Sequence, residues 1–167
     1  MTRPSGTLVE RARADVVLTA VALAFGASSL AHPFGRDQGL YFYVAREWVR
    51  RGAIPYRDVL DHKTPGIYVL HALVIRLFGE AAWGIRLADM VCVMALGWIC
   101  ARLATSPRDP VPRGLRGLSH VAASVFYYGY LNWWDTAQSE LWYATLGIGA
   151  LWAVRHVSRE RAAWPIG

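Results

Sequence analysis

Lysine is almost absent from this 167-residue chain: Lys63 is the only one, and arginine supplies every other basic side chain. The formal net charge is nevertheless +6, so the placement of the arginines decides what that charge is for. They fall in three short clusters between apolar segments, with a scatter through residues 35–86, and they form no single basic face. This placement argues against nucleic acid as a partner and is typical of a membrane topology signal.

Cysteine is also scarce. The two cysteines, Cys92 and Cys100, stand eight residues apart in one apolar segment, about 12 Å along a helix. A disulfide cannot bridge that distance, and the chain has no cysteine spacing typical of a metal site.

Charged residues make up only 18% of the chain, whereas 54% are hydrophobic and mean hydropathy is +0.23. This balance is too apolar for a soluble domain of the same size, so we expect an all-α membrane protein with a lipid-exposed surface. A helix that crosses a bilayer needs roughly 20 apolar residues. Four segments come near that length: Asp15 to Phe34, Ala82 to Ala101, Leu118 to Trp134 and Leu141 to Val157.

A fifth apolar run, residues 65–79, is shorter and contains His71 and Arg76. If it does not span, three arginine-bearing segments share one side, and residues 132–140, which lack Lys and Arg, face the other. If it spans, the arginine-rich segment 102–117 moves to the outside, which the positive-inside rule disfavours. We therefore expect a multi-pass protein of the cell (inner or plasma) membrane, with a cytoplasmic N-terminus, an outer loop over residues 35–81 and 65–79 as an interfacial helix.

The first apolar segment has a second interpretation. Basic residues precede it, and Ser29-Leu30-Ala31 has the small-x-small pattern of a signal-peptide cleavage site. With or without cleavage, the loop that follows lies outside.

The first half of the outer loop predicts an amphipathic interfacial helix. Its apolar residues recur at helical spacing, namely Leu40, Tyr41, Val44 and Trp48. Gly52 is the predicted C-terminal stop and Asp37 the predicted N-cap, a role worth about 1 kcal/mol.

The second half gathers charged side chains just before Pro65, the predicted first residue of the next helix: Arg57, Asp58, Asp61, His62 and Lys63. Two cations beside a helix N-terminus are suited to hold a phosphate at a membrane face. A salt-bridged turn explains the same residues. Asp61 and His62 could contribute to a divalent metal site, although two adjacent residues are a weak signal.

Several motifs in this order resemble the first outer loop of the GT-C glycosyltransferases, in particular the bacterial protein-mannosyltransferase and aminoarabinose-transferase group (glycosyltransferase family 39 type). They are Asp37-Gln38-Gly39-Leu40-Tyr41, Ala45-Arg46, Gly52 to Asp58 and Asp61 to Tyr68. Trp83 to Ala104 is similar to that family's next span, and Ala137 to Glu140 to its second outer loop. Two positions depart from the family pattern: Gln38 replaces a frequent second acid and Thr64 a frequent proline.

The resemblance implies transfer of a sugar from a polyprenyl-phosphate carrier to an acceptor outside the membrane, with inversion at the anomeric carbon. Asp37 matches the catalytic aspartate, which would act as general base toward the acceptor hydroxyl. Lys63 matches the cation that neutralises the carrier phosphate. Gln138 and Glu140, with Asp135, match the second-loop polar motif, although a first-turn acid that complements a helix dipole also explains Glu140.

Residues 1–167 would then be the N-terminal part of such an enzyme, because the family has many more spans. We accordingly expect a truncated product or fragment. The alternative is a small non-catalytic membrane protein that binds a lipid phosphate or a partner enzyme through the same loop. The sequence names neither the sugar nor the acceptor.

Overall fold

The computed structural model describes residues 8–106 and 109–162, and this part of the chain is all-helical. Its elements are α1 (Leu8–Ala27), the 3-10 helix η1 (Ser28–Ala31), α2 (Arg36–Arg51), α3 (Pro65–Phe78), α4 (Ala82–Leu103), α5 (Leu115–Tyr130) and α6 (Ser139–Ala162). No β-strand forms in the described ranges, where an isolated bridge joins Pro55 and Val59. The prediction of an all-α protein is confirmed.

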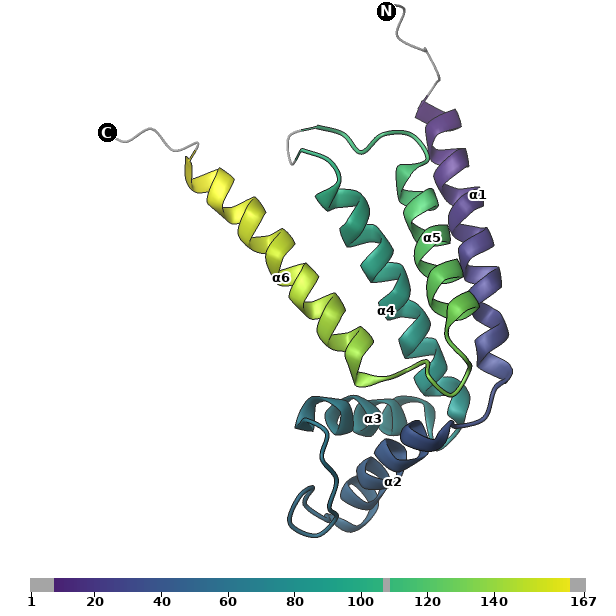
Figure 1. Ribbon diagram of the computed structural model, residues 1–167, viewed down its shortest axis with the longest axis vertical. Coiled ribbons are helices and arrows are strands. Elements are labelled where there is room, and N and C mark those ends of the chain that lie inside the picture. The colour runs from purple at the N-terminus through teal and green to yellow at the C-terminus, as the bar shows by residue number, and fades with distance from the viewer. Residues whose placement is uncertain (1–7, 107–108, 163–167) are drawn as a thin grey trace, which may run out of the picture.

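Four of the helices form a bundle. α1 packs against α5, α5 against α4, and α4 against α6. α1 and α5 run in one direction and α4 and α6 in the other, so the four helices alternate in direction along the chain (Figure 1). α2 and α3 pack against each other and lie across one end of this bundle (Figure 1). We call residues 32–81 the α2/α3 unit. α1 begins and α6 ends at the opposite end of the bundle.

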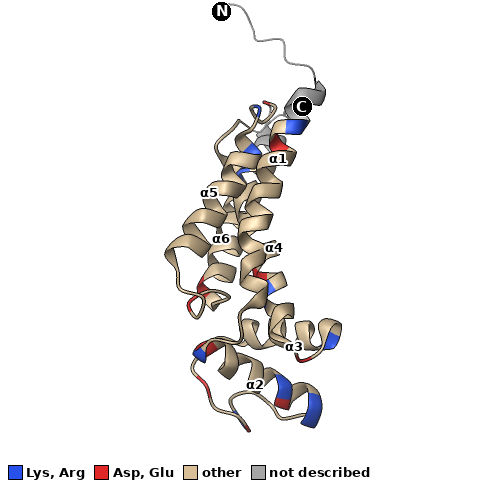
Figure 2. Ribbon diagram, turned by 90° about the vertical axis from the view of Figure 1, so that its right-hand side faces the viewer, with Lys and Arg blue, Asp and Glu red and all other residues tan. Residues whose placement is uncertain are grey.

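Within residues 8–106 and 109–162, two helical stretches are long and apolar enough to cross a membrane. They are Arg13–Ala31, with a mean hydropathy of 1.7, and Ala82–Leu103, with a mean hydropathy of 1.6. α3 has 14 residues and falls short of that length. Charged residues gather toward the ends of the molecule and are sparse along the middle of the bundle (Figure 2). The structure thus provides two helices of membrane-spanning character, where the sequence predicts four.

Local signals explain the ends of α2 and the start of α3. α2 stops at Gly52, which adopts the left-handed conformation (φ 68°), and Pro65 is the first residue of α3, both as predicted. The prediction of Asp37 as N-cap is wrong. α2 begins at Arg36 after Gly35, whose backbone N–H donates to the Gln38 side chain (2.9 Å), and Asp37 lies exposed in the first turn. Cys92 and Cys100 are free thiols, as expected.

The contact between α1 and α5 depends on a glycine. A Cβ atom at Gly117 would lie 2.5 Å from the Cβ of Leu18 and 3.0 Å from the carbonyl oxygen of Asp15. The Asp15 carboxylate accepts a hydrogen bond from the Gly117 N–H (2.9 Å). One turn further along, the Thr19 hydroxyl and the His120 ring are hydrogen-bonded (2.9 Å). The backbones of α1 and α5 therefore approach each other more closely than a side chain at position 117 would allow.

A buried arginine on α4 joins the bundle to its connecting segments. The Arg86 guanidinium donates to the carbonyl oxygens of Pro33 (2.8 Å) and Trp133 (2.9 Å) and to the Thr136 hydroxyl. Arg86 is fully buried, so these bonds compensate for the water that its charge has lost. They fix residues 131–138, which we call the α5–α6 loop, against the beginning of the α2/α3 unit.

A buried acid one turn further along α4 holds the same loop. Asp89 accepts hydrogen bonds from the hydroxyls of Tyr127 (2.9 Å) and Tyr128 (3.0 Å) and from the Ala137 N–H (3.0 Å). Ala137 has a φ of 54°, a left-handed conformation that costs an alanine free energy and persists where its surroundings demand it. The hydrogen bond to Asp89 helps to hold Ala137 in this conformation, which sets the direction in which the chain enters α6.

Candidate functional site

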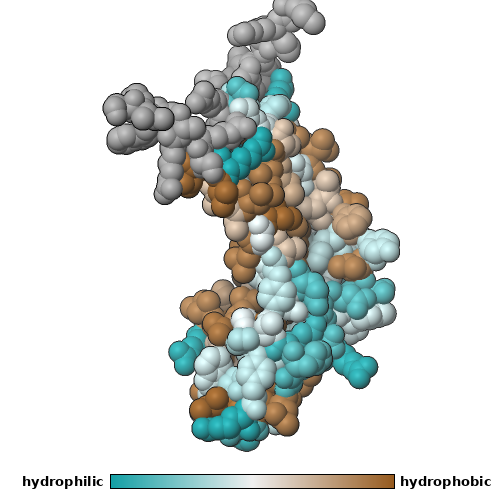
Figure 3. Space-filling model, turned by 60° about the vertical axis from the view of Figure 1, so that its left-hand side comes forward, coloured by the Kyte–Doolittle hydropathy of each residue, from teal (hydrophilic) through white to brown (hydrophobic). Residues whose placement is uncertain are grey.

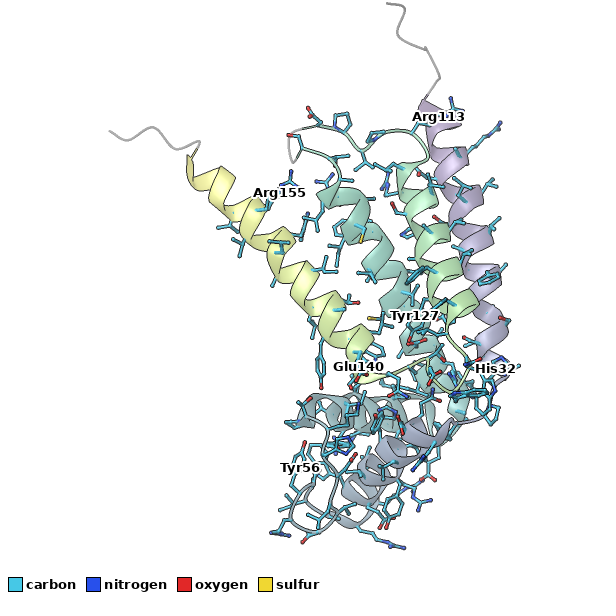
Figure 4. All side chains as sticks on the ribbon, viewed as in Figure 1. His32, Tyr56, Arg113, Tyr127, Glu140 and Arg155 are labelled. Carbon is cyan, nitrogen blue, oxygen red and sulfur yellow. The ribbon has the colours of Figure 1, made fainter. Side chains whose placement is uncertain are left out.

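The candidate site lies where the α2/α3 unit meets the first turn of α6. The Lys63 ammonium lies 2.9 Å from the Glu140 carboxylate and 5.9 Å from the centre of the Tyr41 ring. The Tyr41 hydroxyl donates to the Gln138 side-chain oxygen (3.0 Å). We call Tyr41, Lys63, Gln138 and Glu140 the Lys63 site. Figure 4 labels Glu140 at the junction between α6 and the α2/α3 unit.

The segment that carries Lys63 is held by tyrosines. The Tyr56 hydroxyl donates to the Lys63 carbonyl oxygen, and the Tyr68 hydroxyl donates to the Asp61 carboxylate (2.6 Å). Tyr68 belongs to the buried core of the α2/α3 unit, together with Tyr41, Val44 and Ile67. Packing of α2 on α3 therefore fixes both the backbone at Lys63 and the ring over which its ammonium lies.

Charges within the Lys63 site support one another. The hydrogen bond to Glu140 raises the pKa of Lys63, although partial burial opposes it. Partial burial is the largest single influence on Glu140 and would by itself raise its pKa, but the hydrogen bonds from Lys63, the backbone and Ser139 together outweigh it and lower the pKa. Burial raises the pKa of Tyr41, which stays protonated. At neutral pH the site thus presents an ammonium, a carboxylate and a neutral phenol.

Asp37 lies one helical turn before Tyr41, on the same face of α2. Its side chain is exposed and forms no hydrogen bond or ion pair with the described residues. Its charge nevertheless acts on Tyr41, since it contributes, with Glu140, to raising the pKa of that hydroxyl. The structure therefore places Asp37 on the same face of α2 as Tyr41, a residue of the Lys63 site. The Asp37 carboxylate is open to solvent.

Arg57 and Asp58 pair with each other. The guanidinium donates twice to the neighbouring carboxylate (2.9 and 2.7 Å), which also accepts the Ile54 N–H (2.8 Å). The hydrogen bond from Arg57, followed by that from Ile54, lowers the pKa of Asp58 to about 2. Among the described residues, no hydrogen bond or ion pair joins this exposed pair to the Lys63 site, and its geometry is that of a salt-bridged turn.

Asp61 and His62 also serve the local backbone. The Asp61 carboxylate accepts the Tyr68 hydroxyl and the His62 N–H (2.7 Å), and its side chain is only 2% exposed. The His62 ring lies 3.1 Å from the same carboxylate and is 85% exposed. Within the described ranges, no group of three His, Cys, Asp or Glu side chains is placed to hold a metal ion.

An apolar groove of about 260 Å³ runs between α3 and α6 beside the Lys63 site. Its lining residues are Gly66, Ile67, Val69, Leu70, Leu73, Ser139, Trp142, Tyr143 and Leu146. The hydroxyls of Thr64 and Tyr143 are hydrogen-bonded at the groove's polar end, next in sequence to Lys63. A cation therefore lies beside the mouth of a groove with apolar walls.

Sequence reasoning missed three contributors. The sequence places Tyr41 on the apolar face of a helix and in the Asp37–Tyr41 motif but predicts no contact for its hydroxyl, which reaches Gln138. Arg86 and Asp89 were assigned only to a span, although ionisable residues within an apolar helix usually have a partner or a function. That rule, applied to their three-residue spacing, would have drawn attention to both.

No protein family, curated protein or solved structure matches this chain.

Proposed function

We propose that this chain is a multi-pass membrane protein, or part of one, that transfers a sugar from a polyprenyl-phosphate carrier to an acceptor at one face of the membrane. The observation that carries the proposal is the position of Lys63. Its ammonium lies where the segment between α2 and α3 meets the first turn of α6, two parts of the chain that are far apart in sequence. An apolar groove lies beside it, and the charge of Asp37 acts on the neighbouring Tyr41. A lipid phosphate needs both features, a cation for its phosphate group and an apolar groove for its hydrocarbon chain.

Membrane embedding of the whole bundle is supported by its surface. Large apolar side chains are exposed on all four helices, including Val16 (66%), Val91 (61%), Phe126 (74%) and Leu146 (71%). Water-soluble proteins rarely expose so much contiguous apolar surface. Hydrophobic residues dominate the bundle in Figure 3, whereas hydrophilic residues gather over the α2/α3 unit. Alternating helix directions suit four crossings with the α2/α3 unit on one side, which we propose to be the outer face, opposite the arginine-bearing loops.

Lys63 is proposed to bind the carrier phosphate. Its present partner, Glu140, is 67% exposed, and exposed ion pairs contribute at most about 1 kcal/mol. A phosphate can therefore replace the carboxylate at small cost. The isoprenoid chain would lie in the groove between α3 and α6, and neutralisation by Lys63 would stabilise the phosphate as it leaves the sugar.

Asp37 is proposed as the general base that accepts the proton of the acceptor hydroxyl. Its carboxylate is exposed and forms no hydrogen bond with the described residues, so it is available to an incoming hydroxyl. Gln138 and Glu140 would line the same space from the α5–α6 loop. Asp61 and His62 would support the loop that carries Lys63, whereas Arg57 and Asp58 would pair with each other apart from the Lys63 site, and the chemistry described requires no metal.

The test uses the full chain in phospholipid nanodiscs supplied with radiolabelled polyprenyl-phosphate sugar and with a membrane extract as the source of acceptor hydroxyls. We expect consumption of the donor by the wild type, loss of consumption in Asp37→Asn, and an unchanged rate in Asp58→Asn, the matched control. Binding of unlabelled polyprenyl phosphate is measured in parallel, and Lys63→Gln should weaken it about tenfold whereas Arg57→Gln should not.

The outcomes separate the two candidate functions. Lys63-dependent binding with no consumption by the wild type would favour the non-catalytic lipid-phosphate protein. Donor consumption that survives Asp37→Asn would remove the base from the proposal. Binding that is indifferent to Lys63→Gln would overturn both functions.

A further inference from the structure

A second cavity lies at the same end of the bundle as the Lys63 site. It measures about 250 Å³ and is formed by η1, the end of α5 and the α5–α6 loop. The residues that give it a polar lining are Ser28, Ser29, His32, Tyr128, Asn132 and Thr136. We call it the His32 cavity. Figure 4 shows His32 and Glu140 at this end of the bundle, with the α5–α6 loop between them. None of the described residues that line it also lines the apolar groove, so it is a separate space beside the candidate site.

The wall of the His32 cavity is polar without being acidic or basic. Of the described residues that line it, none is Asp, Glu, Lys or Arg. Two buried charges lie behind the wall: Arg86 donates to the Thr136 hydroxyl, and Asp89 accepts from the Tyr128 hydroxyl. They are opposite in sign, so together they add no net charge to the wall. An ion in the cavity would lack the opposite charge that its burial requires, and a neutral ligand is favoured.

Two polar side chains of this cavity are available to a ligand. The Asn132 amide and the His32 ring nitrogens form no hydrogen bond with the described residues. Together they offer donors and acceptors. The Tyr128 hydroxyl donates to Asp89 (3.0 Å) and keeps lone pairs that can accept. Because a hydroxyl group both donates and accepts, groups of this mixed kind suit a ligand with several hydroxyls.

Aromatic rings and size narrow the choice of ligand. The rings of His32 and Trp133 are stacked, with 5.8 Å between their centres. Such rings offer a large apolar surface, on which the C–H groups of a sugar ring can pack. The volume of about 250 Å³ is below the roughly 300 Å³ at which sites for drug-sized ligands begin. The cavity therefore fits a single neutral sugar ring.

The first turn of α2 packs against the loop that forms this cavity. The Gln38 side-chain nitrogen lies 3.4 Å from the Trp133 carbonyl oxygen, and a Cβ atom at Gly35 would lie 2.8 Å from the Cα atom of Trp134. Asp37 belongs to the same turn. A general base must come within hydrogen-bond reach of the hydroxyl that it activates, so an acceptor has to bind beside this turn.

We propose that the His32 cavity binds the sugar ring of the acceptor, which makes the acceptor a glycoside and not a serine or threonine of a protein. His32 and Asn132 hold its hydroxyls. In the transfer the acceptor oxygen bonds to the anomeric carbon of the donor, and Asp37 takes the proton of that oxygen. The bond from the anomeric carbon to the carrier phosphate breaks, with its electron pair left on the phosphate. The acceptor role rests on the proposed function, whereas binding of a sugar ring does not.

The experiment is saturation-transfer NMR on the full chain in nanodiscs, with the methyl pyranosides of glucose, mannose and galactose as probes and empty nanodiscs as the blank. We expect at least one glycoside to bind. Asn132→Ala and His32→Phe should each weaken that binding about fivefold, because each removes hydrogen bonds to the ligand while phenylalanine can still stack on Trp133. Tyr130→Phe is the matched control, since it removes an exposed hydroxyl that does not line the cavity, and it should change nothing.

Radiolabelled donor is then added, and the glycoside that binds should receive the label. Asn132→Ala should raise its KM about fivefold and leave kcat unchanged. Binding of polyprenyl phosphate should be the same in all variants, which shows that they are folded.

The outcomes distinguish this inference from the proposed function. Transfer to the membrane extract without binding of any glycoside would overturn the inference alone. Glycoside binding without transfer to any acceptor would overturn the proposed function and the acceptor role, and it would leave the sugar-binding cavity in place. Binding that survives both substitutions, that falls equally in Tyr130→Phe, or that is stronger for a short serine peptide would also overturn the inference.

Discussion

The Lys63 ammonium and the Glu140 carboxylate lie 2.9 Å apart although 77 residues separate them in the chain. Lys63 belongs to the segment between α2 and α3, and Glu140 to the first turn of α6. Their ion pair therefore connects the α2/α3 unit to the bundle at the candidate site.

Substitution of Glu140 by Gln should cost little stability, with a defined dependence on pH. The pKa of Lys63 is raised above its ordinary 10.5 and that of Glu140 is lowered below its ordinary 4.5. The ion pair therefore stabilises fully between those values, and loses its effect as pH rises through the folded pKa of Lys63 or falls through that of Glu140. Thermal unfolding in nanodiscs should show a difference below about 1 kcal/mol, because Glu140 is mostly exposed.

The control for that substitution is Glu80→Gln, which removes another exposed pair, Arg50 with Glu80 (2.8 Å). Its loss should be of similar size and should leave lipid-phosphate binding unchanged. A loss of several kcal/mol in Glu140→Gln would show that the pair is far better shielded from water than the structure indicates.

Gln38→Glu should destabilise the junction by about 2 kcal/mol. The buried Gln38 amide accepts the Gly35 N–H with its oxygen and donates with its nitrogen to the Thr136 carbonyl. An ionised carboxylate accepts only, so it would face that carbonyl without a proton to donate. Thermal unfolding at neutral and mildly acidic pH measures the effect, and protonation of the new carboxyl should recover part of the loss.

Gln138→Glu is the comparison for that change, because Gln138 is only partly buried and a carboxylate can still accept the Tyr41 hydroxyl. Equal losses in the two variants would contradict the claim that buried donation to Thr136 is what matters at Gln38.

Gly117→Ala should destabilise the bundle by about 1–3 kcal/mol, since the new Cβ would overlap Leu18 and the α1 backbone at Asp15. Gly147→Ala in α6 is its matched control, with no atom within 4 Å of the added methyl group. There the helix propensity of alanine should stabilise by up to about 1 kcal/mol. Thermal unfolding of both variants should thus shift in opposite directions, and a shift in the same direction would contradict the close packing of α1 on α5.

His71 should make the α2/α3 unit sensitive to acid. Burial lowers the pKa of this histidine to about 4 from an ordinary 6.5, so it is neutral in the folded protein at physiological pH. As pH falls below 6.5 the unfolded chain takes up the proton first, and stability falls by about 3 kcal/mol before the folded state is protonated near pH 4. His71→Phe should remove this slope in pH-dependent unfolding, whereas substitution of the exposed His62 by Gln should preserve it.

Signals that act within a few residues were predictable from the sequence. Gly52 stops α2 because it alone tolerates the left-handed conformation at that position without strain. Pro65 begins α3 because a first-turn residue needs no N–H donor. Both effects are local, so the residue type and its neighbours contain the information.

The contacts that build the site were not predictable in the same way. Aspartate is a residue type that is common at N-caps, which is why Asp37 was predicted there. The Gly35 N–H instead donates to Gln38, because the Gln38 amide is also held by its hydrogen bond to Thr136, 98 residues away. The pairing of Lys63 with Glu140 likewise depends on how Arg86 and Asp89 place the α5–α6 loop. Spacing along one segment contains no information about partners brought together by the packing of others.

The α5–α6 loop is held mainly through its backbone. Arg86 and Gln38 bind its carbonyl oxygens at Trp133 and Thr136, and Asp89 binds the Ala137 N–H. Every residue type except proline offers the same carbonyl and N–H groups, so an exposed side chain of the loop such as Asp135 is free to change during evolution while Glu140 stays in place. Substitutions should therefore accumulate at such an exposed position much faster than at the three buried residues that hold the loop.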